Sequence, residues 1–322
     1  VNANMGEALG QIYVQQVFPE DSKKQMQALV KNLMDALKTR IEKLDWMSAE
    51  TKEKAIAKWN TFDPKIGYPD KWRDFSGLTV DKNKSYLDNA LAATAFENTF
   101  QMSKIGKPAD RTEWGMTPQT VNAYYNPLKN EIVFPAAILQ PPFFDAKADP
   151  ALNYGGIGAV IGHEMLHGFD DQGSQFDKDG NNVNWWSEQD LKNFQARTGK
   201  LVAQFDDYVA IDNLHVKGQL TLGENIADLG GLTVSYDALQ LDLANKKMQA
   251  IDGFSQDQRF FMNWATVWRR NYTPDELKVR LNTDPHSPAH YRAIGAPSNL
   301  DSFATAFSCK AGDAMVRSGD KK

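Results

Sequence analysis

The sequence predicts an α+β fold that is mainly helical and contains a small β-sheet. Apolar residues recur at three- and four-residue steps from Asp21 to Trp46, which is the pattern of an amphipathic helix. Two short runs rich in β-branched and aromatic residues lie between positions 121 and 134. Further along, two histidines are spaced by one helical turn, at positions 163 and 167. Helices packed around a small sheet are therefore expected.

Two more helices are expected before the β-rich region. Ser48 is a good N-cap for a helix that continues to Trp59. The segment 63–70 contains two prolines and a glycine and is expected to interrupt the helical pattern. A third helix is predicted over 87–105, before Gly106. These elements carry no cluster of catalytic residue types, so we interpret them as scaffold.

The two β-rich runs are expected to form a hairpin. Val121–Tyr125 and Glu131–Phe134 are joined by Asn126–Asn130, a segment typical of a turn. An exposed strand edge can bind an extended peptide through its backbone. An ordinary edge strand explains the same residues equally well.

The most informative motif is H-E-x-x-H, formed by His163, Glu164 and His167. We expect a helix over 153–169 to carry it. Residues four apart on a helix lie on the same face, so both imidazoles can bind one metal ion. The glutamate between them can then act on a water molecule at the metal. Two structural histidines on a helix are the simpler alternative.

A catalytic zinc ion takes three protein ligands and keeps one position for water. Glu224 is the candidate for the third ligand, and a separate helix must bring it to the histidines. Asp228 lies one helical turn further on, where it can accept the free N–H of a metal-binding histidine. Taken alone, the two carboxylates would suggest only an exposed acidic helix face.

A segment at 177–181 resembles the start of a calcium-binding loop. Such a loop needs glycine at its sixth position, where this chain has Asn182. The segment is therefore predicted to be a turn. Ser187, followed by Asp190, indicates the start of the next helix.

Composition narrows the classes of function. Of the 322 residues, 42% are hydrophobic, which is enough for a core, and the net charge of -5 argues against nucleic-acid binding. No apolar run is long enough to span a membrane. Val1–Met5 do not have the charged and apolar regions of a secretory signal. Cys309 is the single cysteine, so no internal disulfide is expected.

Four motifs together resemble the neprilysin and endothelin-converting-enzyme family of zinc endopeptidases, in a bacterial-type version. The similarity extends from about Val1 to about Met315. The motifs are Asn122–Tyr125, His163–Gly173, Glu224–Asp228, and His286–Pro288 with Arg292.

The resemblance implies a thermolysin-like zinc peptidase catalytic domain over residues 87–322. Residues 1–86 would be a helical segment belonging to a capping domain or linker. Family members are typically longer, so a companion chain carrying the N-terminal half, or a second copy, is expected. We expect it to pack against residues 1–86, because the apolar face of the first helix needs a partner surface.

The resemblance also implies roles for individual residues. One Zn²⁺ per chain would be held by His163, His167 and Glu224. Glu164 would be the general base, His286 the donor to the developing oxyanion, and Asp228 the partner of a zinc-binding histidine. Substrate-binding roles carry over to these residues: Asn122, Ala123, Arg292, Ile138, Phe143, Val160, Val267 and Trp268.

The predicted function is hydrolysis of internal bonds in short peptides, on the amino side of large hydrophobic residues. The resemblance also suggests a periplasmic or extracellular location. Two alternatives stay open at this point. One is a non-catalytic peptide-binding or assembly subunit that needs the N-terminal half, and the other is aminopeptidase action at the same zinc ion.

Overall fold

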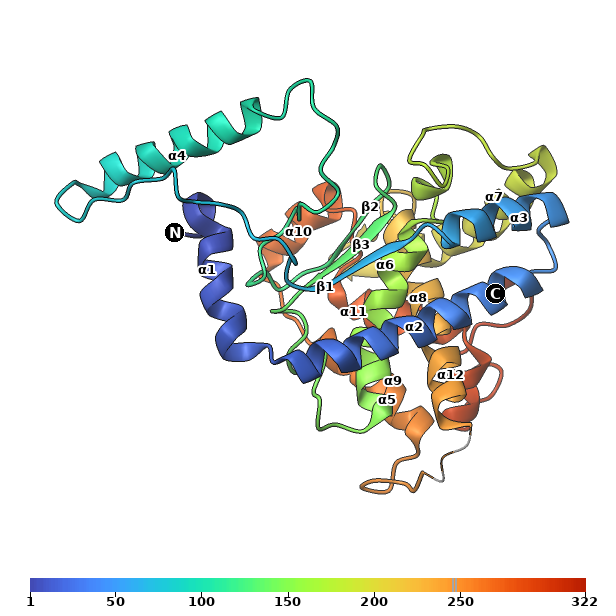
Figure 1. The fold of residues 1–322 in the computed structure, drawn as a ribbon. Coiled ribbons are helices and arrows are strands. Elements are labelled where there is room, and N and C mark those ends of the chain that lie inside the picture. The colour runs from blue at the N-terminus through green and yellow to red at the C-terminus, as the bar shows by residue number, and fades with distance from the viewer. Residues whose placement is uncertain (245, 247) are drawn as a thin grey trace.

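Helices surround a small three-stranded sheet in the computed structural model of the chain (Figure 1). The structure describes residues 1–244, 246 and 248–322. The predicted class, α+β and mainly helical, is confirmed. Among the described residues, no helix is both long and apolar enough to cross a membrane.

The predicted N-terminal helices are present, with shifted ends. They are α2 (Glu20–Lys43), α3 (Ala49–Trp59) and α4 (Tyr86–Met102). The Ser48 hydroxyl caps α3 by accepting from the backbone N–H of Thr51, as the sequence predicts.

An additional helix, α1 (Asn2–Val17), was not predicted. Gly6 and Gly10 lie on its buried side, where a side chain on either would collide with the segment around Pro118. Because the packed face consists largely of glycines, no apolar stripe indicates this helix in the sequence.

The sheet has the order β1-β3-β2. β2 (Tyr124–Asn126) and β3 (Glu131–Pro135) pair antiparallel, which confirms the predicted hairpin. The helical pattern is interrupted at 63–70 as predicted, but the strand in this segment was not predicted: β1 (Asp63–Gly67) pairs in parallel with β3. β1 is an edge strand, and such a strand can accommodate a proline.

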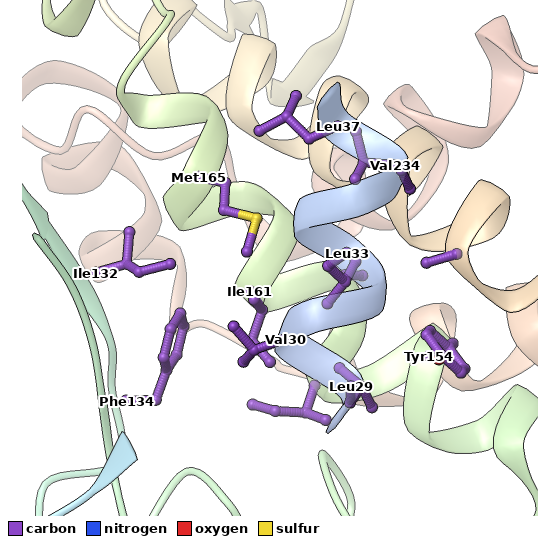
Figure 2. Packing of buried hydrophobic residues seen from close by; sticks show 14 of the residues in the cluster. Leu29, Val30, Leu33, Leu37, Ile132, Phe134, Tyr154, Ile161, Met165 and Val234 are labelled. Atoms are coloured by element: carbon purple, nitrogen blue, oxygen red, sulfur yellow. The ribbon is translucent and has the colours of Figure 1, made fainter. Parts of the chain in front are cut away.

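The apolar face of α2 packs inside this same chain. Figure 2 shows Leu29, Val30, Leu33 and Leu37 facing α6, the sheet and α8, with Ile161 among their neighbours. Leu33 is fully buried. The partner surface that this face was expected to need is therefore supplied by later elements of the same chain. The expected second polypeptide stays a prediction. The predicted units 1–86 and 87–322 share one core, and the boundary between them stays a prediction.

The histidine motif lies on a continuous helical run, as expected. The run consists of α5 (Pro150–Asn153), a π-helical turn (Tyr154–Gly158) and α6 (Ala159–His167). α6 crosses α8 (Leu222–Leu243) at very short range. A Cβ atom on Gly162 would lie 2.5 Å from the carbonyl oxygen of Gly231. The missing side chains let the two backbones touch.

The remaining elements complete the body around these two helices. The predicted turn at 177–181 leads to α7, which begins after the capping residue Ser187. The elements are α7 (Glu188–Asp206), β4 (Val209–Ile211), β5 (Leu214–His215), α9 (Gln256–Val267), α10 (Pro274–Thr283), α11 (Ala289–Gly295), α12 (Asp301–Ala306) and short 3₁₀ turns at 173–175, 297–299 and 319–321.

The glycine contact predicts a specific sensitivity. In Gly231→Ala, the new Cβ would lie 2.3 Å from the backbone nitrogen of His163, so α8 must move away from α6. We expect the free energy of unfolding to fall by about 1–3 kcal/mol, as for other overpacked cores. Denaturant unfolding measures it.

Gly199→Ala is the matched control, because nothing lies within 4 Å of its Cβ position on α7. This substitution should raise stability by about 0.5–1 kcal/mol. Equal stability changes for the two variants would contradict the proposed close crossing.

Candidate active site

All of the predicted site residues line one cleft with a volume of about 880 Å³. They come from α6, α8, α9 and the residue after it, α11, the segment between β3 and α5, and the segments before β2 and α11. The sequence places them far apart, and the fold brings them together. They are Asn122, Ala123, Ile138, Phe143, Val160, His163, Glu164, His167, Glu224, Asp228, Val267, Trp268, His286 and Arg292.

Three ligand-type side chains converge on one point at the base of the cleft. The Nε2 atoms of His163 and His167 lie 2.9 Å apart. Glu224 Oε2 lies 3.2 Å from His163 Nε2, and Glu224 Oε1 lies 3.7 Å from His167 Nε2. One ligand atom from each residue lies within 4.8 Å of the other two, so the three form a possible metal site.

The opposite ring nitrogens are held by carboxylates. Because an ionised carboxylate only accepts, His163 Nδ1 donates to Asp228 (2.8 Å) and His167 Nδ1 donates to Asp170 (2.7 Å). These bonds orient both rings and leave both Nε2 lone pairs directed at the shared point. The role of Asp228 was predicted from the sequence, whereas Asp170 was not predicted to have one. Its position one turn after His167 was the available signal.

The donor set fits a zinc ion. Glu224 Oε2 is buried and forms no hydrogen bond, and two imidazole nitrogens lie beside it. Three lone-pair atoms so close together repel one another unless a cation lies between them. Two imidazoles and one carboxylate are a common ligand set of catalytic zinc.

The electrostatic field at His163 also favours a bound cation. Burial by itself would lower the pKa of His163, but the hydrogen bond to Asp228 and the charges of Asp228 and Glu224 outweigh it and raise the pKa to about 10. The pKa of Glu224 is lowered, because His163 and Arg292 outweigh the opposing effect of burial. The site thus stabilises positive charge on or beside the His163 ring.

Arg292 lines the cleft and is largely buried. Its Nε and Nη2 atoms donate to the two oxygens of Asp228, each at 2.7 Å. Its guanidinium also lies 4.0 Å from the centre of the Trp268 ring. The family resemblance implies that Arg292 binds the substrate, and this role stays a prediction. The structure shows that it holds Asp228, and through Asp228 it reaches His163.

Glu164 and His286 are placed for proton transfer and hydrogen bonding. The Glu164 side chain is only 6% exposed, and burial raises its pKa against the opposing charges of His163 and His167. His286 is exposed at the cleft, with Nδ1 2.7 Å from Asp284 and Nε2 3.2 Å from Glu224 Oε2. A buried carboxylate with a raised pKa suits a general base.

The predicted peptide-binding residues lie to either side. β2 is shorter than expected, so exposed Asn122 and buried Ala123 lie just before the strand. The predicted pocket residues line the cleft as well, and their roles stay predictions: Ile138, Phe143, Val160, Val267 and Trp268.

Comparison with known proteins identifies the family of the chain. A family model described as "Peptidase family M13" matches residues 122–322, which is more than half of the chain, and a second model of that family matches residues 1–69. The chain belongs to peptidase family M13. The resemblance to neprilysin and endothelin-converting enzyme is thereby confirmed.

Three M13 relatives show the extent of the similarity. The endothelin-converting enzyme homolog of Locusta migratoria is 40% identical over 98% of this chain and 44% of its own length. The inhibitor-bound zinc metalloprotease Zmp1 of Mycobacterium tuberculosis matches with a TM-score of 0.94 and 47% identity, over all of this chain and 49% of the other. PepO of Lactobacillus rhamnosis matches with a TM-score of 0.90 and 36% identity, over 99% of this chain and 49% of the other. The chain spans about half the length of these M13 relatives.

The ring-orienting carboxylates lead to a prediction about metal affinity. Asp228→Asn keeps the size of the side chain but weakens its hold on His163 Nδ1. We expect the zinc dissociation constant to rise about 10–100-fold. Competition with a chromophoric chelator measures it.

Asp237→Asn is the matched control, because Asp237 is also on α8 but pairs with Arg40 (2.6 Å) instead of a ligand. Its zinc affinity should equal that of the unmodified chain. An unchanged zinc affinity in the Asp228→Asn variant would show that Asp228 does not support the metal site.

Proposed function

We propose that this chain is the zinc-binding catalytic part of an endopeptidase that hydrolyses internal bonds of short peptides. One observation carries the proposal. His163, His167 and Glu224 converge within 4.8 Å, and Glu164 from the same helix faces the same cleft. Membership of family M13 supports the same activity.

A bound zinc ion would polarise the scissile carbonyl and make a water molecule acidic enough to attack near neutral pH. The chain supplies the proton transfers. Glu164 accepts the proton of the attacking water and later delivers it to the leaving amine. His286 donates a hydrogen bond to the former carbonyl oxygen as negative charge develops on it, an interaction typically worth about 3–4 kcal/mol.

The walls of the cleft suit an extended peptide. We propose that Asn122 and Ala123 bind its backbone beside β2, which is an edge strand of the sheet. The apolar residues Phe143, Val160 and Val267 favour a large hydrophobic side chain immediately after the cleaved bond. By family resemblance, we propose that the protein acts in the periplasm or outside the cell.

The general base can be tested separately from the metal site. Glu164→Gln preserves shape and all three ligands, so zinc should bind with one ion per chain. Peptide turnover should fall by about 10²–10⁴-fold, because the proton acceptor is lost. Quenched-fluorescent peptides measure the turnover, and elemental analysis measures the zinc.

His163→Ala is the control that should lose both zinc and turnover. Near-normal turnover by zinc-loaded Glu164→Gln would contradict the mechanism. Peptides with a blocked N-terminus must also be cleaved, because an aminopeptidase could not cut them. A zinc-loaded but inactive chain would favour the binding-subunit alternative.

We further propose that a second polypeptide, either a companion chain or a second copy, packs on the exposed side of α4. Figure 1 shows this helix extending away from the body. Its side chains Leu87 and Leu91 are 64% and 59% exposed, and Met102 is 63% exposed. By family resemblance, we propose that such a polypeptide covers the cleft and restricts substrates to peptides.

Light scattering and denaturing mass spectrometry on native material test this partner. We expect a particle larger than 36.1 kDa that dissociates when Leu87 and Leu91 are both changed to Glu, since buried charge opposes packing. Leu241→Glu, an equally exposed position on α8, should leave the particle intact. A monomer that cuts folded proteins would contradict both the partner and the size limit.

A further inference from the structure

Lys58 is a buried cation for which the proposed chemistry has no direct use. It lies in the last turn of α3, and the residue is only 1% exposed. Burial lowers its pKa to about 8, against the opposing charges of Asp170 and Asp177. A lysine is seldom buried so completely unless its ammonium group has specific partners.

Those partners lie in the turn that follows the histidine motif. Lys58 Nζ donates to the carbonyl oxygens of Gly173 and Phe176, both at 2.7 Å. The ammonium also lies 5.7 Å from the ring centre of Phe169 and 5.9 Å from that of Tyr125, a residue of the cleft. The cation is thus enclosed between the scaffold helix and the floor of the active site.

The same turn holds the carboxylate that orients His167. Asp170 Oδ1 accepts from the backbone N–H groups of Gln172 (2.9 Å) and Gly173 (2.6 Å), and Oδ2 accepts from His167 Nδ1 (2.7 Å). Asp170 can be positioned correctly only if these two backbone N–H groups are in place.

Gly173 connects the two sets of contacts. Its N–H donates to Asp170, and its carbonyl oxygen accepts from Lys58. A Cβ atom at this position would lie 1.7 Å from the carbonyl oxygen of His167, so the glycine backbone lies directly on the ligand residue. A shift of Gly173 would therefore move both Asp170 and the end of α6.

We propose that Lys58 is a positioning residue for the metal site: by binding the carbonyls of Gly173 and Phe176, it fixes the turn that holds Asp170 against His167. The proposal rests on the zinc site of the proposed function. It adds a residue from the N-terminal scaffold to the set that controls how tightly the metal is held.

Neighbouring side chains secure other parts of the turn, but none replaces Lys58 at Gly173. Trp186 Nε1 donates to the carbonyl of Ser174, and Trp185 Nε1 donates to that of Phe176, each at 3.1 Å. Among the described residues, Lys58 is the one side chain that donates to the Gly173 carbonyl. Its loss should therefore loosen the turn at the residue that touches His167.

The test compares zinc affinities of folded variants by chelator competition. Lys58→Met removes the charge and both hydrogen bonds but keeps a side chain of similar length. It should raise the zinc dissociation constant about 10-fold, which is the lower end of the effect expected when a partner of a metal ligand is lost. When Lys58→Met is added to Asp170→Asn, the zinc dissociation constant should rise by much less than a further 10-fold, because both substitutions disturb the same chain of contacts to His167. A general loss of stability would not produce this non-additivity.

Lys65→Met is the matched control. Lys65 is also largely buried on the scaffold, but it binds Glu131 (2.6 Å) and carbonyls far from the turn. Its variant can lose stability, yet its zinc affinity should match that of the unmodified chain. If Lys58→Met does not fold, Lys58→Arg keeps the charge without the same two-carbonyl geometry and should bind zinc about fivefold less tightly.

Each outcome has a separate meaning. If the unmodified chain fails to bind zinc, the proposed function itself fails. If it binds zinc and the Lys58 variants bind equally tightly, only the role of Lys58 is overturned. Fully additive effects of Lys58→Met and Asp170→Asn would also overturn it, because Lys58 would then act independently of Asp170.

Discussion

The close crossing of α6 and α8 is the constraint on which the active site depends. Gly162 and Gly231 remove the side chains that would separate the two helices. The helices therefore approach closely enough for Glu224 and Asp228, on α8, to reach opposite nitrogens of the His163 ring. Without this contact, the H-E-x-x-H helix would carry two metal ligands and lack the third. The close packing of the two helices is therefore required before the three metal ligands can meet.

Charge balance is the second requirement. Four carboxylates, from Glu164, Asp170, Glu224 and Asp228, are gathered around two imidazoles in a mostly buried site. Arg292 compensates part of this charge through its paired hydrogen bonds with Asp228. A divalent cation between the Nε2 atoms and Glu224 would compensate more. The arrangement that raises the pKa of His163 is therefore also one that attracts a metal ion.

Features that follow a local sequence pattern could be predicted from the sequence. Features that depend on close packing between distant segments could not. Histidines one turn apart and a capped helix start at Ser48 have local signatures, so both were predicted. α1 was not, because its buried face consists largely of glycines. Pro64 concealed the edge strand β1, and the partner surface of α2 proved to lie within the chain. Lys58 looks like any helical lysine until the fold buries it against the turn after α6.

X-ray absorption at the zinc edge, on the chain loaded with one equivalent of zinc, tests the central claim most directly. We expect two imidazole nitrogens at about 2.0–2.1 Å and at least one carboxylate oxygen around the ion. His163, His167 and Glu224 are the donors that supply this set. A spectrum with sulfur ligation from Cys309, or with fewer than two imidazoles, would contradict it.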